Sequence, residues 1–252
     1  QQTDGFGDGI GGVAFLNSFD DNIDNPCFNF NKGDNTGSMT VSHESGHTFG
    51  LVHDGLNGSE YHPGTGSGET SWGPIMGAPF GSTLVQWSIG DYAGATSTQN
   101  DTSVIPSSAN GVLFLADDHG NTTGTASLVG AATGCPVPTP GSASGTLGTR
   151  TDVDAFRFTT AAGLVTVSAV PFDPGGNLDL EMRVLDAGGS TLATVNDANQ
   201  ADASITLDLA AGNHFVLVDG IGKSGVYSDY GCIGQFTVLV TAPGQQSFTN
   251  LG

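Results

Sequence analysis

The feature that most constrains this chain is the run from His43 to Asp54, which reads HESGHTFGLVHD. On an α-helix, His43 and His47 lie about one turn apart on the same face, because they are separated by four residues. Two imidazoles on one face can reach the same metal ion. Gly50 has no Cβ and can end such a helix with a positive φ, so that the chain turns and His53 supplies a third ligand.

Three neutral imidazoles leave a fourth position for water, which is characteristic of a catalytic zinc site. Glu44 directly follows the first ligand, where its carboxylate can hold a water molecule beside the metal. The sequence therefore predicts one Zn²⁺ ion bound by His43, His47 and His53, with Glu44 as the general base. An ordinary helix with two surface histidines is the competing interpretation, and it does not account for the added glycine and third histidine.

A turn-rich segment, 71–78, follows this run and contains Met76. Together they resemble the signature of the metzincin zinc metallopeptidases, and Asp54 after the third histidine resembles their reprolysin or adamalysin branch. The resemblance implies that Met76 forms an apolar floor beneath the zinc and that Asp54 is a buried structural carboxylate. Without it, Met76 reads as a core residue and Asp54 as a solvated turn residue. Ala78 stands where astacins and serralysins carry a tyrosine, so no tyrosine ligand is predicted.

The same resemblance assigns roles to segments on either side of the motif. It implies that Gly12, Val13, Ala14 and Phe15 form an edge strand that binds the substrate backbone. A closing helix is expected over 84–95, and Ser38 or Thr40 is expected to cap the zinc helix. Only 42 residues precede His43. The resemblance therefore covers only the lower half of a catalytic domain, together with its edge strand.

Residues 147–242 have a different sequence pattern. Apolar and polar residues alternate there in short runs separated by Gly and Asp turns, which predicts an antiparallel β-sandwich. The alternating apolar positions are Phe156, Phe158, Val165, Val167, Leu178, Leu180, Met182, Val184, Ile205, Leu207, Leu209, Phe215 to Val218, Phe236, Val238 and Val240. Hairpin turns are expected at 186–189 and 209–213.

This second region resembles the bacterial pre-peptidase C-terminal (PPC) domain. The matching segments are DVDAF at 152–156, NLDL at 177–180, LAAG at 209–212 and YSDYG at 227–231. The resemblance implies an exported protein and a ligand in the extracellular matrix or on a cell surface. Aspartates in Asp- and Gly-rich loops can also bind Ca²⁺. The candidates are Asp152, Asp154, Asp179 and Asp229, and the alternative is that they are turn and strand-end residues.

The predicted fold class is therefore α+β. It comprises the lower part of a metzincin-like catalytic domain, with zinc helix, Met-turn, C-terminal helix and edge strand, followed by an antiparallel β-sandwich. The expected divisions are a zinc peptidase domain over 1–112 that lacks its N-terminal part, a linker or start of the second domain over 113–146, the sandwich over 147–242, and a tail over 243–252.

The charge and the cysteine content limit which partners and which cellular location are expected for the chain. With 25 acidic against 5 basic residues, its formal net charge is −20. Nucleic acid and anionic membrane surfaces are therefore not expected partners, and no apolar run is long enough to span a membrane. We expect a secreted bacterial protein. In that setting Cys135 and Cys232 can pair and Cys27 has a partner upstream, whereas three reduced thiols are the alternative.

The leading functional prediction is a zinc endopeptidase that hydrolyses internal peptide bonds of proteins. An alternative from another class is a non-catalytic module that binds matrix or cell-surface material through the β-sandwich. A third alternative is a metal-dependent amidase acting on a substrate other than protein. The expected edge strand argues against this third alternative, because such a strand suits an extended peptide.

Overall fold

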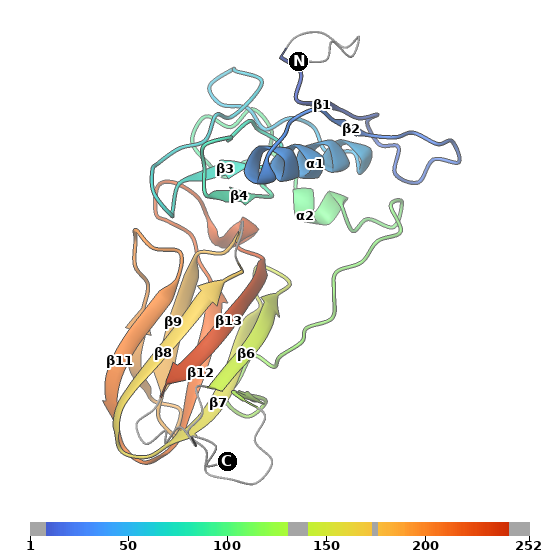
Figure 1. Cartoon of the computed structure of the whole chain (residues 1–252). Coiled ribbons are helices and arrows are strands. Elements are labelled where there is room, and N and C mark those ends of the chain that lie inside the picture. The colour runs from blue at the N-terminus through green and yellow to red at the C-terminus, as the bar shows by residue number, and fades with distance from the viewer. Residues whose placement is uncertain (1–8, 131–140, 173–175, 242–252) are drawn as a thin grey trace, which may run out of the picture. The chain divides into compact units, whose positions relative to one another are not determined.

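The computed structural model describes residues 9–130, 141–172 and 176–241 and divides the chain into two compact units (Figure 1). The first unit comprises Gln1–Phe114 together with Lys223–Gly231, and the second comprises Leu115–Gly222 and Cys232–Gly252. Within the described ranges, no helix is long and apolar enough to cross a membrane.

The second unit consists of two β-sheets packed face to face (Figure 1). One sheet has the strand order β10-β9-β12-β7-β5 and the other the order β11-β8-β13-β6. All pairings are antiparallel except the short parallel pair of β5 with β7. The strands are β5 (Ser127–Leu128), β6 (Gly141–Leu147), β7 (Val153–Thr160), β8 (Gly163–Pro171), β9 (Leu180–Leu185), β10 (Thr191–Val195), β11 (Ala203–Leu209), β12 (Gly212–Gly220) and β13 (Gly234–Thr241).

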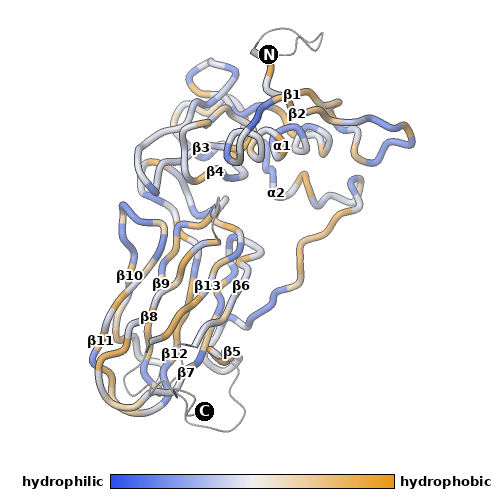
Figure 2. The backbone as a smooth tube through the Cα atoms, viewed as in Figure 1, coloured by the Kyte–Doolittle hydropathy of each residue, from blue (hydrophilic) through white to orange (hydrophobic). Residues whose placement is uncertain are grey.

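Side-chain alternation explains why these segments form a sandwich. Successive residues of a strand point to opposite faces, so every second apolar side chain enters the space between the sheets. Val165, Val167, Val216, Val218 and Val238 are fully buried there. Figure 2 shows the apolar stretches along β8, β12 and β13. The predicted β-sandwich is therefore confirmed. The predicted hairpin turn at 186–189 connects the paired strands β9 and β10. The predicted hairpin at 209–213 is wrong, because this turn leads from β11 in one sheet to β12 in the other.

The first unit has little regular structure. Its elements are β1 (Gly12–Val13), β2 (Phe28–Asn29), α1 (Asp34–Thr48), β3 (Trp72–Pro74), β4 (Leu84–Gln86), α2 (Asp101–Val104) and the 3₁₀ turn η1 (Asp229–Gly231). A small core of Leu51, Ile75 and Met76 holds the loops around α1 together. Backbone hydrogen bonds between loops supply much of the remaining order, as expected where few residues lie in helices or sheets.

The predicted fold class is wrong in its first half. Most of the regular secondary structure in the described residues is β-strand, with only the two α-helices α1 and α2, and no metzincin-like helical catalytic domain is present there. In particular, no helix forms over 84–95. Leu84–Gln86 instead pairs in parallel with Trp72–Pro74, and Gly90 and Gly94 take positive φ values of 69° and 80° that no helix admits.

The start of α1 also differs from the prediction. The helix begins at Asp34, preceded by Gly33 with a φ of 94°, and no side chain caps its first turn. Ser38 and Thr40 lie inside the helix, where the Thr40 hydroxyl donates to the Thr36 carbonyl oxygen at 2.8 Å. Their hydroxyls therefore act within the helix and not as its N-cap.

The observed division into units falls between Phe114 and Leu115, and the expected tail over 243–252 lies outside the described residues. Cys135 also lies outside them, so the predicted pairing with Cys232 is untested. Cys232 is buried, and its thiol donates to the Ile221 carbonyl oxygen at 2.6 Å. Cys27 is exposed and forms no disulfide within the described residues.

Asp101 gives the first unit a predicted pH dependence. It is 1% exposed, and its Oδ2 accepts a hydrogen bond from the Ser88 amide at 2.8 Å. Burial raises the pKa of its carboxyl from 3.8 to about 8. Its contribution to stability is therefore complete below pH 3.8 and is lost as the pH rises through about 8. We therefore compare the free energy of unfolding of Asp101→Asn with that of the wild type by urea unfolding. The difference should change in favour of the variant as the pH rises from 5 to 8.5, because only the wild type loses stability over this range.

The exposed Asp91 supplies the control for this prediction, because Asp91→Asn removes the same charge from the surface of the same unit. The Asp91 variant should track the wild type at both pH values. A stability difference between wild type and Asp101→Asn that is the same at pH 5 and pH 8.5 contradicts the prediction.

Candidate metal centre

Helix α1 and the loop that follows it bring His43, His47 and His53 together. One ring nitrogen from each histidine lies within 4.8 Å of those of the other two. The helix ends at Thr48, and Gly50 has a φ of 100°, in the left-handed region that favours glycine. This turn lets the chain double back toward the helix, as the sequence predicted.

The first two imidazoles are anchored through Nδ1. The Nδ1 atom of His43 lies 2.8 Å from the Ile75 carbonyl oxygen, and that of His47 lies 2.7 Å from the Leu51 carbonyl oxygen. A carbonyl oxygen can only accept, so each Nδ1 donates. Each Nε2 therefore carries a lone pair, which is the tautomer that a metal-binding histidine requires.

The third imidazole is anchored by a carboxylate. Nδ1 of His53 lies 2.8 Å from Oε1 of Glu60, and Nε2 of His53 lies 3.0 Å from Nε2 of His47. Two nitrogens bound tetrahedrally to one zinc ion at about 2.0–2.1 Å are roughly 3.3 Å apart. The donor set and its spacing therefore fit zinc.

Burial favours the neutral, metal-binding form of His43 and His47. Burial lowers the pKa of His43 to about 4, and it also lowers that of His47. Glu44 is 6% exposed, and burial raises its pKa to about 7. A carboxyl group with a pKa near neutrality suits a residue that accepts and returns a proton.

The segment that contains Met76 packs against the helix and is hydrogen-bonded to the segment that follows His53. Met76 is fully buried, and a Cβ placed on Gly46 would lie 2.5 Å from its sulfur. Asp54 is 1% exposed, and burial raises its pKa to about 7, so it is not a solvated turn residue. Its amide donates to the Met76 carbonyl oxygen at 2.9 Å, and its own carbonyl accepts from the His62 amide at 2.8 Å.

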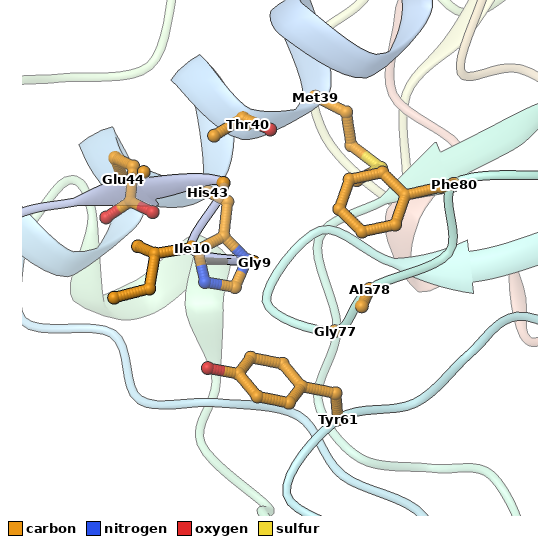
Figure 3. Close-up of a pocket in the computed structure, with 12 residues that line it drawn as sticks. Gly9, Ile10, Met39, Thr40, His43, Glu44, Tyr61, Gly77, Ala78 and Phe80 are labelled. Atoms are coloured by element: carbon orange, nitrogen blue, oxygen red, sulfur yellow. The ribbon is translucent and has the colours of Figure 1, made fainter. Parts of the chain in front are cut away.

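A cavity of about 330 Å³ opens beside His43 and Glu44. Figure 3 shows these two side chains on α1 and Tyr61 across the cavity from them. The apolar part of the lining includes Met39 and Phe80. A cavity of this size next to a candidate base is large enough for one substrate side chain.

The predicted edge strand is present only in part. Gly12 and Val13 form β1, which pairs with β2, whereas Ala14 and Phe15 lie beyond the strand and Phe15 is 58% exposed. Gly12 also lies against the candidate base. A Cβ on Gly12 would lie 2.6 Å from Cγ of Glu44 and 2.7 Å from the Phe28 carbonyl oxygen.

We therefore predict that Gly12→Ala displaces Glu44. Since a misplacement of about 1 Å can cost roughly 100-fold in rate, kcat/KM for a peptide substrate should fall by at least about tenfold. Steady-state hydrolysis measures this effect. Gly81→Ala is the control, because a Cβ at Gly81 meets nothing within 4 Å. Equal rates for the Gly12 variant and the wild type would contradict the prediction.

Sequence reasoning missed Glu60 and Tyr61. The Tyr61 ring lies 4.3 Å, centroid to centroid, from that of His53. Burial and the nearby charges of Glu60 and Glu44 raise the pKa of Tyr61, so its hydroxyl is a donor at neutral pH. An Asn-Gly pair ahead of them at 57–58 was the available signal, because it predicts a tight hairpin.

A second cluster of possible metal ligands lies in the second unit. Oxygens of Asp117, Asp152 and Asp154 lie within 4.8 Å of one another. Asp154 is fully buried on the inward face of β7. Neither of its carboxylate oxygens has a hydrogen-bond partner of good geometry, and the nearby Thr146 backbone only partly offsets the cost of burial. Burial, and then repulsion from Asp152, Asp118 and Asp117, raises its pKa to about 8. Such a site favours either a proton or a cation.

Two of the predicted calcium ligands are not part of this cluster. Among the described residues, neither Asp179 nor Asp229 belongs to a group of three close carboxylate, imidazole or thiol ligands. Asp229 belongs to the first unit. The structure therefore groups Asp152 and Asp154 with Asp117, a residue that the sequence prediction did not include.

No protein-family model matches the chain, and no curated protein matches it. Several solved structures are similar to part of it. The pre-peptidase C-terminal domain of a Bacillus anthracis collagenase is 13% identical with a TM-score of 0.33, covering 46% of this chain and 94% of that one. Aeromonas hydrophila PliG, a periplasmic inhibitor of g-type lysozyme, is 14% identical with a TM-score of 0.32, covering 46% and 95%.

A family 35 carbohydrate-binding module from Clostridium thermocellum is 16% identical with a TM-score of 0.23, covering 34% of this chain and 68% of that module. The β-sandwich of the second unit is established by its own strands and their register.

Proposed function

We propose that this chain is a zinc-dependent endopeptidase whose first unit hydrolyses internal peptide bonds of proteins. One observation carries the proposal. Three imidazoles, each fixed through Nδ1, converge their other ring nitrogens beside a buried glutamate, Glu44. Three neutral nitrogen donors and an open fourth position are characteristic of catalytic zinc sites.

The site residues have distinct tasks in this proposal. His43, His47 and His53 hold the ion, which when bound supplies a Lewis acid that polarises a carbonyl group and lowers the pKa of water. Glu44 accepts the proton of the attacking water on its carboxylate and later delivers that proton to the leaving amine. Its pKa of about 7 lets it do both at neutral pH.

The neighbouring cavity indicates which part of a substrate lies beside the base. Met39, Ala78 and Phe80 give it an apolar lining, so an apolar side chain next to the scissile bond fits it best. The β1 strand beside Glu44 has backbone groups that can pair with an extended peptide. These features favour a protein substrate over a non-peptide amide.

Hydrolysis of an unfolded protein by the purified chain tests the proposal. A chelator should abolish cleavage, and adding Zn²⁺ back after the chelator is removed should restore it. A serine-protease inhibitor should have no effect. Cleavage that continues at the same rate in a metal-free preparation refutes a zinc-dependent mechanism.

A second candidate function is binding to matrix or cell-surface material through the β-sandwich. The observation that favours it is the outward face of the β11-β8-β13-β6 sheet, which carries a set of short hydroxyl side chains and no basic residue. These are Ser142, Ser144, Thr146, Thr166, Ser168, Ser204, Thr206, Thr237 and Thr241. Co-sedimentation of the chain with insoluble collagen or polysaccharide tests this function, and Leu239→Glu in the middle of the face should abolish it.

We also propose that the carboxylates of Asp117, Asp152 and Asp154 bind Ca²⁺ and stabilise the second unit. Carboxylate oxygens are ligands that suit calcium. A bound cation would stabilise the Asp154 carboxylate, whose buried oxygens have no hydrogen-bond partner of good geometry. An extracellular bacterial location fits both ions, because calcium is abundant outside cells and a secreted peptidase meets its substrates there.

A further inference from the structure

The third histidine differs from the other two in the group that holds it. Backbone carbonyls, which are neutral, accept from Nδ1 of His43 and His47. The group that accepts from His53 is the carboxylate of Glu60, at 2.8 Å. A carboxylate makes the opposite ring nitrogen a stronger donor to a metal ion than a carbonyl does, because its negative charge stabilises the polarised imidazole.

A rigid hairpin places Glu60 at this position. Asn57 and Gly58 have φ values of 52° and 87°, as in the tight turns that reverse a strand on itself. On either side of the turn, the Leu56 amide donates to the Ser59 carbonyl oxygen at 3.2 Å, and the Ser59 amide donates back at 2.9 Å. The chain therefore returns to His53 within seven residues.

Contacts to the rest of the first unit hold this hairpin in place. The Asn57 amide donates to the Gly94 carbonyl oxygen at 2.7 Å, and the Tyr92 hydroxyl donates to the Gly55 carbonyl oxygen at 2.9 Å. A Cβ on Gly55 would collide with the Ser59 carbonyl oxygen, so the two arms of the hairpin lie in direct contact. The backbone that carries Glu60 is thus fixed before any metal binds.

We propose that Glu60 is a positioning residue that fixes the orientation of His53 and strengthens its bond to zinc. This inference rests on the proposed zinc site and adds a residue to it. The Glu60 side chain is 67% exposed, so an ion pair with a free histidine would contribute little to stability. The carboxylate acts when His53 binds the ion, since metal binding polarises the Nδ1–H group that it holds.

Zinc affinity of the purified full chain tests this role, measured by competition with a chromogenic chelator. Loss of a group that orients a ligand typically weakens metal binding about 10–100-fold, so we expect a loss of that size for Glu60→Ala. Glu60→Gln keeps an acceptor but loses the charge, and it should fall between the wild type and the Ala variant. Glu69→Gln removes the same charge from an exposed position of the same loop and should bind zinc as the wild type does.

Substitution of Co²⁺ for zinc gives a spectroscopic measurement of the metal site itself, which distinguishes a change in the ligands from a change in folding. The visible absorption bands of the bound cobalt should shift in both Glu60 variants and not in Glu69→Gln, while all three keep the wild-type circular dichroism. Zinc affinities of both Glu60 variants within twofold of the wild type, with unshifted cobalt bands, overturn the inference. If His53→Ala weakens zinc binding in that case, the zinc site stands and only the role of Glu60 fails. If wild-type protein binds no zinc, both proposals fail.

Discussion

Replacing Glu44 with glutamine is expected to lower kcat for peptide hydrolysis by about 10²–10⁴-fold, the usual contribution of a general base. Glutamine has nearly the same shape as glutamate but cannot accept the proton of the attacking water. The affinity for zinc should remain that of the wild type, because Glu44 is not one of the three converging ligands. Single-turnover hydrolysis of a peptide, together with metal analysis of the same sample, measures both quantities.

Glu69→Gln controls for the loss of a negative charge elsewhere in the first unit and should retain the full rate. A Glu44→Gln protein that cleaves as fast as the wild type refutes the assignment of the base. A variant that loses both zinc and activity refutes the division of tasks, because it would make Glu44 part of the metal site.

Calcium is expected to raise the midpoint temperature of unfolding of the second unit by on the order of 10 °C. Ligand at about 100 times its dissociation constant stabilises a folded protein by about 2.7 kcal/mol, and 1 kcal/mol shifts the midpoint of a domain of about 100 residues by roughly 4 °C. The effect should be lost in Asp154→Asn, since this substitution removes the fully buried carboxylate of the cluster. Calorimetry at pH 7.5, with calcium and with chelator, measures it.

Without calcium, the order of the two unfolding temperatures should be reversed. The chelated Asp154→Asn protein should unfold at a higher temperature than the chelated wild type. Burial raises the pKa of Asp154 to about 8, so without calcium its carboxylate has to take up a proton when the chain folds at pH 7.5, and asparagine has no such cost. Asp208→Asn, on an exposed position of β11, should behave as the wild type with and without calcium. An equal calcium-induced shift in the wild type and Asp154→Asn contradicts the proposed site.

Local patterns in the sequence were sufficient to predict two parts of the structure. The alternation of Val165 with Val167, or of Val216 with Val218, identified strands because a strand buried on one face needs an apolar residue at every second position. The His43–Asp54 run identified the converging histidines because helix periodicity and one glycine turn determine where its ligands lie.

Other features depend on contacts between distant segments, which the sequence does not display. Leu84–Gln86 became a strand because Trp72–Pro74 offered a parallel partner, and this tertiary pairing outweighed a weak helical pattern. Glu60 reaches His53 only through the hairpin at 57–58. Asp117 joins the acidic cluster because the loop that contains it lies beside β7, and no spacing of aspartates in the chain indicates this.

Zinc stoichiometry, measured by native mass spectrometry, tests the central claim most directly. Metal-free wild type, Glu44→Gln and His53→Ala are each mixed with a small excess of Zn²⁺, and the bound ions are counted. The account predicts one tightly bound zinc ion per chain in the wild type and in Glu44→Gln, and none retained by His53→Ala. A wild type that holds no zinc, or a His53→Ala protein that holds it as tightly as the wild type, would contradict the proposed metal centre.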